Sequence, residues 1–88
     1  MGRNQALKFF VYVVQCADKT LYTGIATDVA RRVAEHNTSP RGAKYTRSRR
    51  PVTLLYSEEF PNRATASAAE HQIKKLPRAE KLRLFFVR

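Results

Sequence analysis

The chain is short and strongly basic. It has 88 residues, with 17 Lys and Arg against 7 Asp and Glu, which gives a formal net charge of +10. We expect one small domain over residues 1–88, because a chain of this length builds a single thin core and leaves no room for a second module. The charge favours nucleic acid as partner over an acidic membrane face or an inert basic surface.

Cysteine content and hydropathy exclude disulfide-stabilised, zinc-binding and membrane-spanning proteins. Cys16 is the only cysteine, so the chain forms no internal disulfide and offers no zinc-ligand cluster. This usage fits a reducing, cytoplasmic location, with Cys16 as a small buried hydrophobe at a strand end. No apolar run approaches the roughly 20 residues of a membrane span, so we expect no membrane partner.

The first half of the chain predicts a β-hairpin followed by a helix. Residues 8–15 are rich in Phe, Val and Tyr, and residues 21–25 resume the same pattern after a polar turn. Thr27 or Asp28 can cap a helix that runs to about His36.

The second half predicts a loop, a strand and two helices. Residues 37–51 contain three helix- and strand-breaking residues and are expected to be a loop. Residues 52–56 form a third strand. Asn62 can cap a helix through Leu76, and Pro77 suits the first turn of a last helix.

These elements define the expected fold class. Their order is β-β-α-β-α-α, and hairpin pairing makes the sheet mainly antiparallel. We therefore expect a small α/β (α+β) domain in which a three-stranded sheet is flanked by helices.

Five residues lie at fixed distances from one another in the sequence, and local structure alone does not require this spacing. Tyr12 lies in the tripeptide VYV, and Tyr22 begins the tripeptide YTG. Arg32 lies eight residues after the glycine of YTG, and His36 lies four residues after Arg32, on the same helix face. Glu70 falls on the second long helix. Each of these residues has an ordinary structural explanation, but as a set they point to a nuclease site.

With these residues in register, the chain resembles the GIY-YIG nuclease superfamily over about residues 8–84. The similarity is greatest to small stand-alone bacterial members, which share the KYTRSRRPV-like loop and the IKKLPRAEK-like tail. The sequence departs from the pattern in two places. The first motif lacks its glycine, and no asparagine follows Glu70, although many members carry one there.

The resemblance implies a metal-dependent DNA endonuclease that hydrolyses phosphodiester bonds. Glu70 would hold one Mg²⁺ or Mn²⁺ ion, since a single carboxylate with waters and substrate oxygens suits a hydrated Mg²⁺. Without the resemblance, an i,i+4 ion pair with Lys74 is the better explanation of Glu70. Arg32 would present its planar guanidinium to a phosphate, where the alternative is a solvated surface arginine.

The resemblance also implies that Tyr12 is the general base. Tyrosine has an unperturbed pKa near 10, so only about one in a thousand is ionised at pH 7. Tyr12 therefore needs nearby cations or a proton relay through His36 or Tyr22, and we expect an alkaline activity optimum. Alternatively, both tyrosines are ordinary strand aromatics, and His36 is a residue favoured by the helix C-terminus.

Basic residues with an interleaved tyrosine predict how the chain binds DNA. Such a mixture fits backbone tracking with base stacking, and it contains no sequence-reading element. We therefore expect single-stranded or branched DNA as substrate, with little sequence specificity; a solvated basic loop is the alternative. The predicted nucleic-acid-binding residues are Arg41, Lys44, Tyr45, Arg47, Arg49, Arg50 and Lys74.

Two other functions fit the same sequence. The chain can be a non-catalytic nucleic-acid-binding domain that kept the fold. It can also be a nuclease subunit that is active only with a protein partner, which supplies substrate specificity. A role in DNA repair is one of several that the sequence allows.

Overall fold

Three strands and four helices make up residues 8–86, the part of the chain that the computed structural model describes; side chains are described as far as Arg83. Residues 1–7, 87 and 88 of the predicted domain lie outside the described residues. The strands are β1 (Phe9–Gln15), β2 (Leu21–Ala26) and β3 (Thr53–Phe60). The helices are α1 (Val29–Thr38), α2 (Lys44–Arg47), α3 (Arg63–Lys75) and α4 (Arg78–Phe86).

The described strands form one antiparallel sheet in the order β2-β1-β3. β1 is the central strand, so it is buried on both faces and its sequence is a nearly continuous apolar run. In this register Tyr12 lies between Gly24 on β2 and Ser57 on β3. The predicted three-stranded, mainly antiparallel sheet is thereby confirmed.

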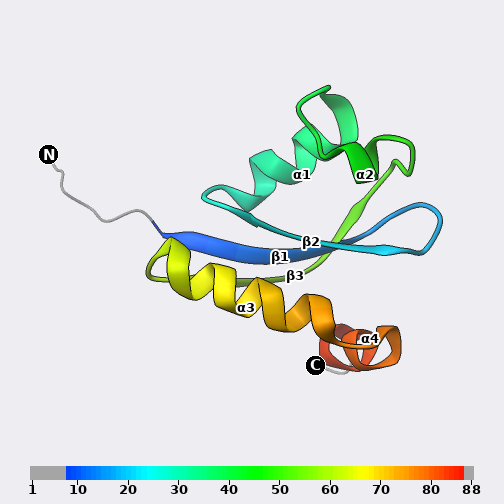
Figure 1. Cartoon of the computed structure of the whole chain (residues 1–88). Coiled ribbons are helices and arrows are strands. Elements are labelled where there is room, and N and C mark those ends of the chain that lie inside the picture. Colours follow the sequence, from blue (N-terminus) through cyan, green and yellow to red (C-terminus); the bar gives the residue numbers. More distant parts are fainter. Residues whose placement is uncertain (1–7, 87–88) are drawn as a thin grey trace, which may run out of the picture.

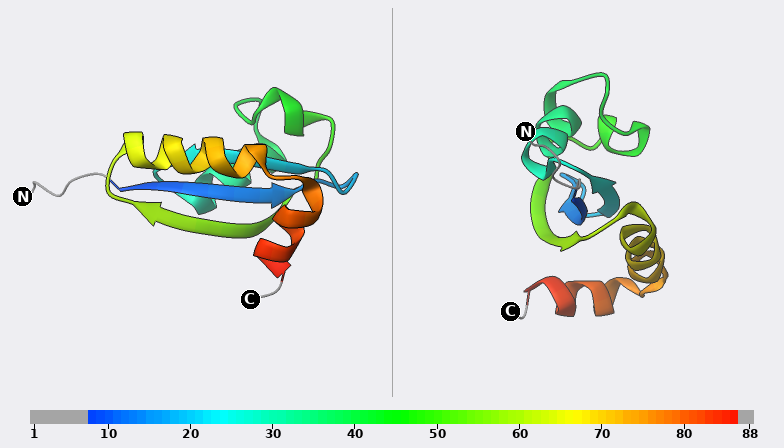
Figure 2. Two further views of the ribbon diagram at one scale, coloured as in Figure 1. Left: turned by 60° about the horizontal axis from the view of Figure 1, so that its bottom comes forward. Right: turned by 90° about the vertical axis from the view of Figure 1, so that its left-hand side faces the viewer.

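Helices cover both faces of the sheet. Figure 1 shows α1 and α2 on one face and α3 and α4 on the other, and both views in Figure 2 agree. Alternation along β1 sends successive side chains to opposite faces. On the α3 face, the buried cluster consists of Val11, Val13, Ala66 and Ile73. On the α1 face, it consists of Tyr12, Val14, Cys16 and Val52.

Polar side chains fix where the two long helices begin. The carboxylate of Asp28 accepts from the backbone N–H of Arg31 at 3.0 Å, and the side-chain oxygen of Asn62 accepts from Thr65 N–H at 2.9 Å. Each bond satisfies one of the free N–H groups of a first helical turn. Both predicted caps are confirmed, with Asp28 rather than Thr27 as the cap of α1.

The predicted loop at residues 37–51 is only partly a loop. α1 continues to Thr38, and the short helix α2 occupies Lys44–Arg47. A four-residue helix has too few residues to show an apolar period, so the sequence pattern could not reveal it. β3 also extends to Phe60 instead of ending at Tyr56, because β1 pairs with it along its whole length.

None of the helices in residues 8–86 has the length and apolar character that crossing a membrane requires.

Candidate active site

Tyr12 lies at the centre of the molecule, on the middle strand and facing α1. Its side chain is only 1% exposed, and its hydroxyl Oη lies 2.7 Å from Nε2 of His36. The ring of Tyr22 adjoins both groups, with its centroid 6.5 Å from that of Tyr12 and 5.3 Å from that of His36. The structure therefore brings together Tyr12, Tyr22 and His36, which come from β1, β2 and α1, and Tyr45 of α2 packs on Tyr22.

Gly24 makes the position of Tyr12 possible. A Cβ atom at Gly24 would lie 2.6 Å from Tyr12 Oη and 2.7 Å from Cζ, far inside ordinary contact distance. The phenol ring thus lies directly over the backbone of β2, where only glycine leaves room. The glycine of the YTG motif serves close packing here, since its φ angle is not positive.

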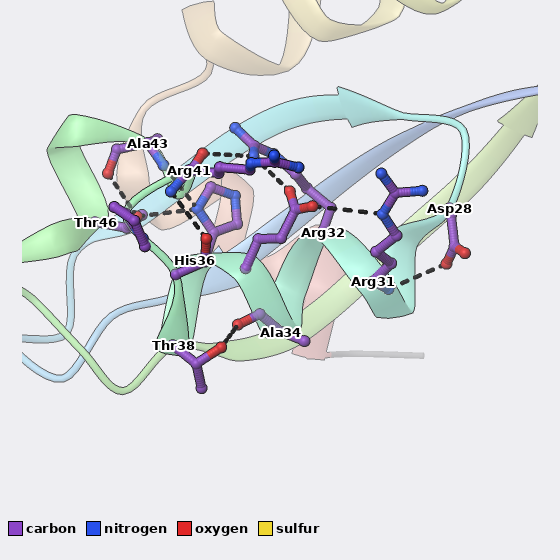
Figure 3. A network of polar contacts seen from close by, with 12 residues as sticks. Asp28, Arg31, Arg32, Ala34, His36, Thr38, Arg41, Ala43 and Thr46 are labelled. Atoms are coloured by element: carbon purple, nitrogen blue, oxygen red, sulfur yellow. Dashed lines mark hydrogen bonds and ion pairs between the residues drawn. The ribbon is translucent and has the colours of Figure 1, made fainter.

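His36 is fully buried in the last part of α1 and bonded at both ring nitrogens. While Nε2 faces Tyr12, Nδ1 accepts from the backbone N–H of Ala43 at 3.2 Å and lies 3.0 Å from the Thr46 hydroxyl. Figure 3 shows the ring held between α1 and the following loop. Burial lowers the pKa of His36, the positive charge of Arg32 adds to this effect, and the ring is therefore neutral at pH 7.

Arg32 lies one turn before His36 and is half-buried. Its Nη1 donates to a carboxylate oxygen of Glu35 and to the carbonyl oxygen of Arg41, both at 2.9 Å. A guanidinium has five N–H donors in a planar fork, more than these two contacts use. Arg32 also lines an open cleft of about 200 Å³ between the end of β2 and α1, together with Arg31 and Glu35.

The electrostatic surroundings of Tyr12 oppose its ionisation. Burial, together with the neighbouring Tyr22, raises the pKa of Tyr12 to about 12. Arg32 acts in the opposite direction, and the carboxylate of Glu70 adds to the increase. The cations near Tyr12 therefore do not outweigh its desolvation, and neutral phenol is the resting form.

Glu70 lies on α3, on the other face of the sheet from Tyr12, and its link to the site is the effect of its charge on the pKa of Tyr12. Its side chain is 23% exposed and forms an i,i+4 ion pair with Lys74 at 3.1 Å. Among the described residues, no group of three His, Cys, Asp or Glu side chains lies close enough to hold a metal. The single carboxylate of Glu70 fits one hard cation that keeps most of its water. It does not fit a metal held by protein ligands alone or a two-metal site. Lys74 is 55% exposed and can leave the carboxylate when a cation binds.

Tyr45 forms the solvent-facing end of the aromatic cluster. Its ring stacks on Tyr22 with centroids 5.8 Å apart, and the guanidinium carbon of Arg49 lies 4.0 Å from its ring centroid. Arg49 is also paired with Asp18 at 3.0 Å, so the cation is fixed over the ring. Tyr45 remains 40% exposed, which is high for a large aromatic side chain.

The basic loop residues have different surroundings. Arg41 and Lys44 are exposed, and Arg47 is exposed while it donates to the carbonyl oxygen of Pro40 at 3.0 Å. Arg50 instead turns inward and donates to the backbone carbonyls of His36 and Ser39 at the end of α1. The guanidinium of Arg50 thus satisfies carbonyl groups that the helix terminus leaves open.

The sequence reasoning missed the residues that hold His36 in place. They are Gly42, Ala43 and Thr46, which belong to the predicted basic loop. A Cβ atom at Gly42 would lie 2.8 Å from His36 Cα, so the loop packs directly on α1. A glycine within a basic segment was the only local signal, and a turn explains it equally well.

Comparison with known proteins agrees with this geometry. The family model of the GIY-YIG catalytic domain matches residues 8–83. The chain belongs to the GIY-YIG nuclease family. The predicted resemblance is therefore confirmed, and four of its motif residues, Tyr12, Tyr22, Arg32 and His36, adjoin one another on the α1 face.

Several relatives share most of this GIY-YIG domain. A UPF0213 protein of Natronomonas pharaonis is 54% identical over 79 residues, which cover 90% of this chain and 92% of that protein. A UPF0213 protein of Desulfotalea psychrophila is 62% identical over 68 residues, which cover 77% of this chain and 62% of the longer relative. The solution NMR structure of a UPF0213 protein from Bacillus halodurans superimposes with a TM-score of 0.56 at 42% identity, covering 88% of this chain and 81% of that one.

Proposed function

We propose that the chain is a metal-dependent endonuclease that hydrolyses phosphodiester bonds in single-stranded or branched DNA with little sequence specificity. Tyr12 acts as general base, Arg32 binds the scissile phosphate, and Glu70 holds one divalent metal ion. Tyr22 and His36 complete the catalytic group.

One observation carries this proposal. A buried tyrosine hydroxyl lies within hydrogen-bond distance of a histidine, and both an arginine and a glutamate from other positions act on its pKa. A strand, a helix and a second helix on the opposite face supply these groups, so packing alone does not require their convergence. Acids and bases with perturbed pKa values cluster at functional sites, because catalytic groups need pKa values that match their role in the reaction.

The chemistry follows from the roles of the side chains. Arg32 can contact two phosphoryl oxygens at once and stabilise the charge that develops on them. Tyr12 takes a proton from the attacking water, and its burial makes the phenolate a strong base once formed. Glu70 would hold a divalent ion, which would supply Lewis-acid stabilisation of the charge that develops on the phosphoryl group.

The exposed face of the site supports the choice of substrate. Tyr45 and the basic loop residues offer one stacking surface and several phosphate contacts, without an element that reads base edges. Unstacked bases can reach Tyr45, whereas bases within a regular duplex are already stacked. Comparable cleavage of plain duplex and single strand would contradict this part of the proposal.

A second function is favoured by one contact. The ion pair between Glu70 and Lys74 occupies the carboxylate that would hold the metal. This arrangement fits a non-catalytic nucleic-acid-binding domain, or a subunit that becomes active only when a protein partner rearranges the site.

A cleavage assay separates these functions. Purified protein is mixed with end-labelled single-stranded, duplex and branched DNA, with Mg²⁺, Mn²⁺ or a chelator. Glu70→Ala is compared with Glu80→Ala, a matched change at an exposed carboxylate whose contact is an ion pair with Arg83. We expect metal-dependent cleavage that only Glu70→Ala abolishes, with DNA binding retained in both variants. Binding without cleavage in any metal would favour the second function, and added cell extract would then test for a partner.

A further inference from the structure

The hydrogen bonds at His36 fix which of its nitrogens carries the proton. Ala43 donates its backbone N–H to Nδ1, and a backbone amide can only donate. Nδ1 must therefore present its lone pair, and in a neutral imidazole the proton lies on the other nitrogen. The Thr46 hydroxyl near Nδ1 agrees with either tautomer, because it can also donate to the Ala43 carbonyl at 2.9 Å.

The opposite side of the ring then determines the role of Tyr12. Nε2 faces Tyr12 Oη at 2.7 Å, so the N–H at Nε2 donates and the phenol oxygen accepts. The hydroxyl proton of Tyr12 must point away from His36, because the space between the two groups already holds one proton.

The charges around His36 keep the ring neutral. Arg32 of α1 and Arg50 of the following loop face it with positive charge, and both oppose its protonation. Glu35 of α1 is the carboxylate that acts in the other direction, while Tyr12 and Tyr22 contribute uncharged rings from the sheet. A neutral ring with Nδ1 already bonded has no lone pair to offer Tyr12.

We infer that the loop after α1 holds His36 as the Nε2–H tautomer, so that His36 is a positioning residue that donates to Tyr12 and never accepts its proton. This inference rests on the proposed function and specifies how its base is generated. The clamp consists of Gly42, Ala43 and Thr46, and Arg50 anchors it to the end of α1.

The proton balance of the reaction follows from this arrangement. The phenol proton of Tyr12 leaves on the side away from His36 and is taken by hydroxide from solvent. The phenolate, stabilised by the N–H of His36, then removes a proton from the attacking water as its oxygen bonds to phosphorus. The bond from phosphorus to the leaving oxygen breaks, and that oxygen takes a proton from solvent. The proton on His36 stays in place throughout.

Two substitutions at His36 test the inference. Gln carries an amide N–H that can take the place of Nε2–H, but it cannot act as a base near neutral pH; Leu has neither property. We expect His36→Gln to cleave DNA within about tenfold of the wild-type rate, and His36→Leu to lose about 10²-fold, the effect of a lost hydrogen bond to a charged group. Equal loss in both folded variants would overturn the inference, because it would indicate proton transfer at His36.

A spectroscopic measurement tests the tautomer without any activity. Long-range ¹H–¹⁵N NMR spectra of the full chain distinguish a protonated Nε2 from a protonated Nδ1. We expect protonated Nε2 in the wild type, and a mixture of tautomers in Gly42→Ala, where the added methyl group displaces the loop from α1. Protonated Nδ1 in the wild type would overturn the inference. If no DNA is cleaved but Nε2 carries the proton, the proposed function fails and the structural clamp stands.

Discussion

Gly24→Ala is the most direct test of the site geometry. The added methyl group would lie 2.6 Å from Tyr12 Oη, whereas ordinary contact between such atoms is about 3.5 Å. The phenol must therefore retreat by about 1 Å. The 2.7 Å hydrogen bond to His36 would lengthen by the same amount and break. A displacement of this size at the reacting group costs about 10²-fold in rate.

The expected effect on stability is smaller than the effect on activity. Overpacking at one site costs about 1–3 kcal/mol in the free energy of unfolding. Single-turnover cleavage rates and thermal unfolding curves of Gly24→Ala would be compared with those of Ser57→Ala. Ser57 is the matched control, since it flanks Tyr12 on β3 as Gly24 does on β2 and already carries a Cβ atom. A folded Gly24→Ala variant that cleaves at the wild-type rate would refute the reasoning.

Four further predictions concern the metal, the base and the loop. Glu70→Gln keeps the shape of the side chain but removes its charge, and we expect about a 10²-fold loss of cleavage that raised Mg²⁺ concentrations partly restore; an unchanged metal requirement would argue against Glu70 as ligand. Because a base works only when deprotonated and the pKa of Tyr12 is raised to about 12, the cleavage rate should rise about tenfold per pH unit from pH 7 to 9; a flat profile would exclude tyrosinate as the base. Arg50→Met should lower the melting temperature, since it leaves the carbonyls at the end of α1 without their donor. Arg41→Met and Lys44→Met should leave the melting temperature unchanged and instead weaken DNA binding, with a reduced dependence on salt.

Local sequence signals predicted most of the fold. The hairpin, the caps at Asp28 and Asn62 and the apolar faces of the helices all depend on residues within a few positions of one another. Periodicity and capping chemistry are local properties, so they can be read from the sequence. The order of the strands, with β1 in the centre, depends on long-range pairing and was not predicted.

The candidate site was predicted less completely for the same reason. The family resemblance named Tyr12 and His36, and the structure brings them into contact across 24 residues. It gave no indication that Arg50 would turn inward, because a run of basic residues looks alike whether a guanidinium faces solvent or a helix end. Only the packed structure separates Arg50, which bonds to backbone carbonyls, from exposed neighbours such as Lys44.

The aromatic cluster gives the protein an intrinsic optical reporter. The chain has no tryptophan and four tyrosines, so its near-ultraviolet emission comes from tyrosine alone. Tyr12, Tyr22 and Tyr45 lie in one chain of rings, with neighbouring centroids 6.5 and 5.8 Å apart, which runs from the buried Tyr12 to the surface. A nucleic-acid base that stacks on Tyr45 would quench emission from this group directly. Substrate binding can therefore be followed by fluorescence in the unlabelled protein, on the same timescale as cleavage and at the site itself.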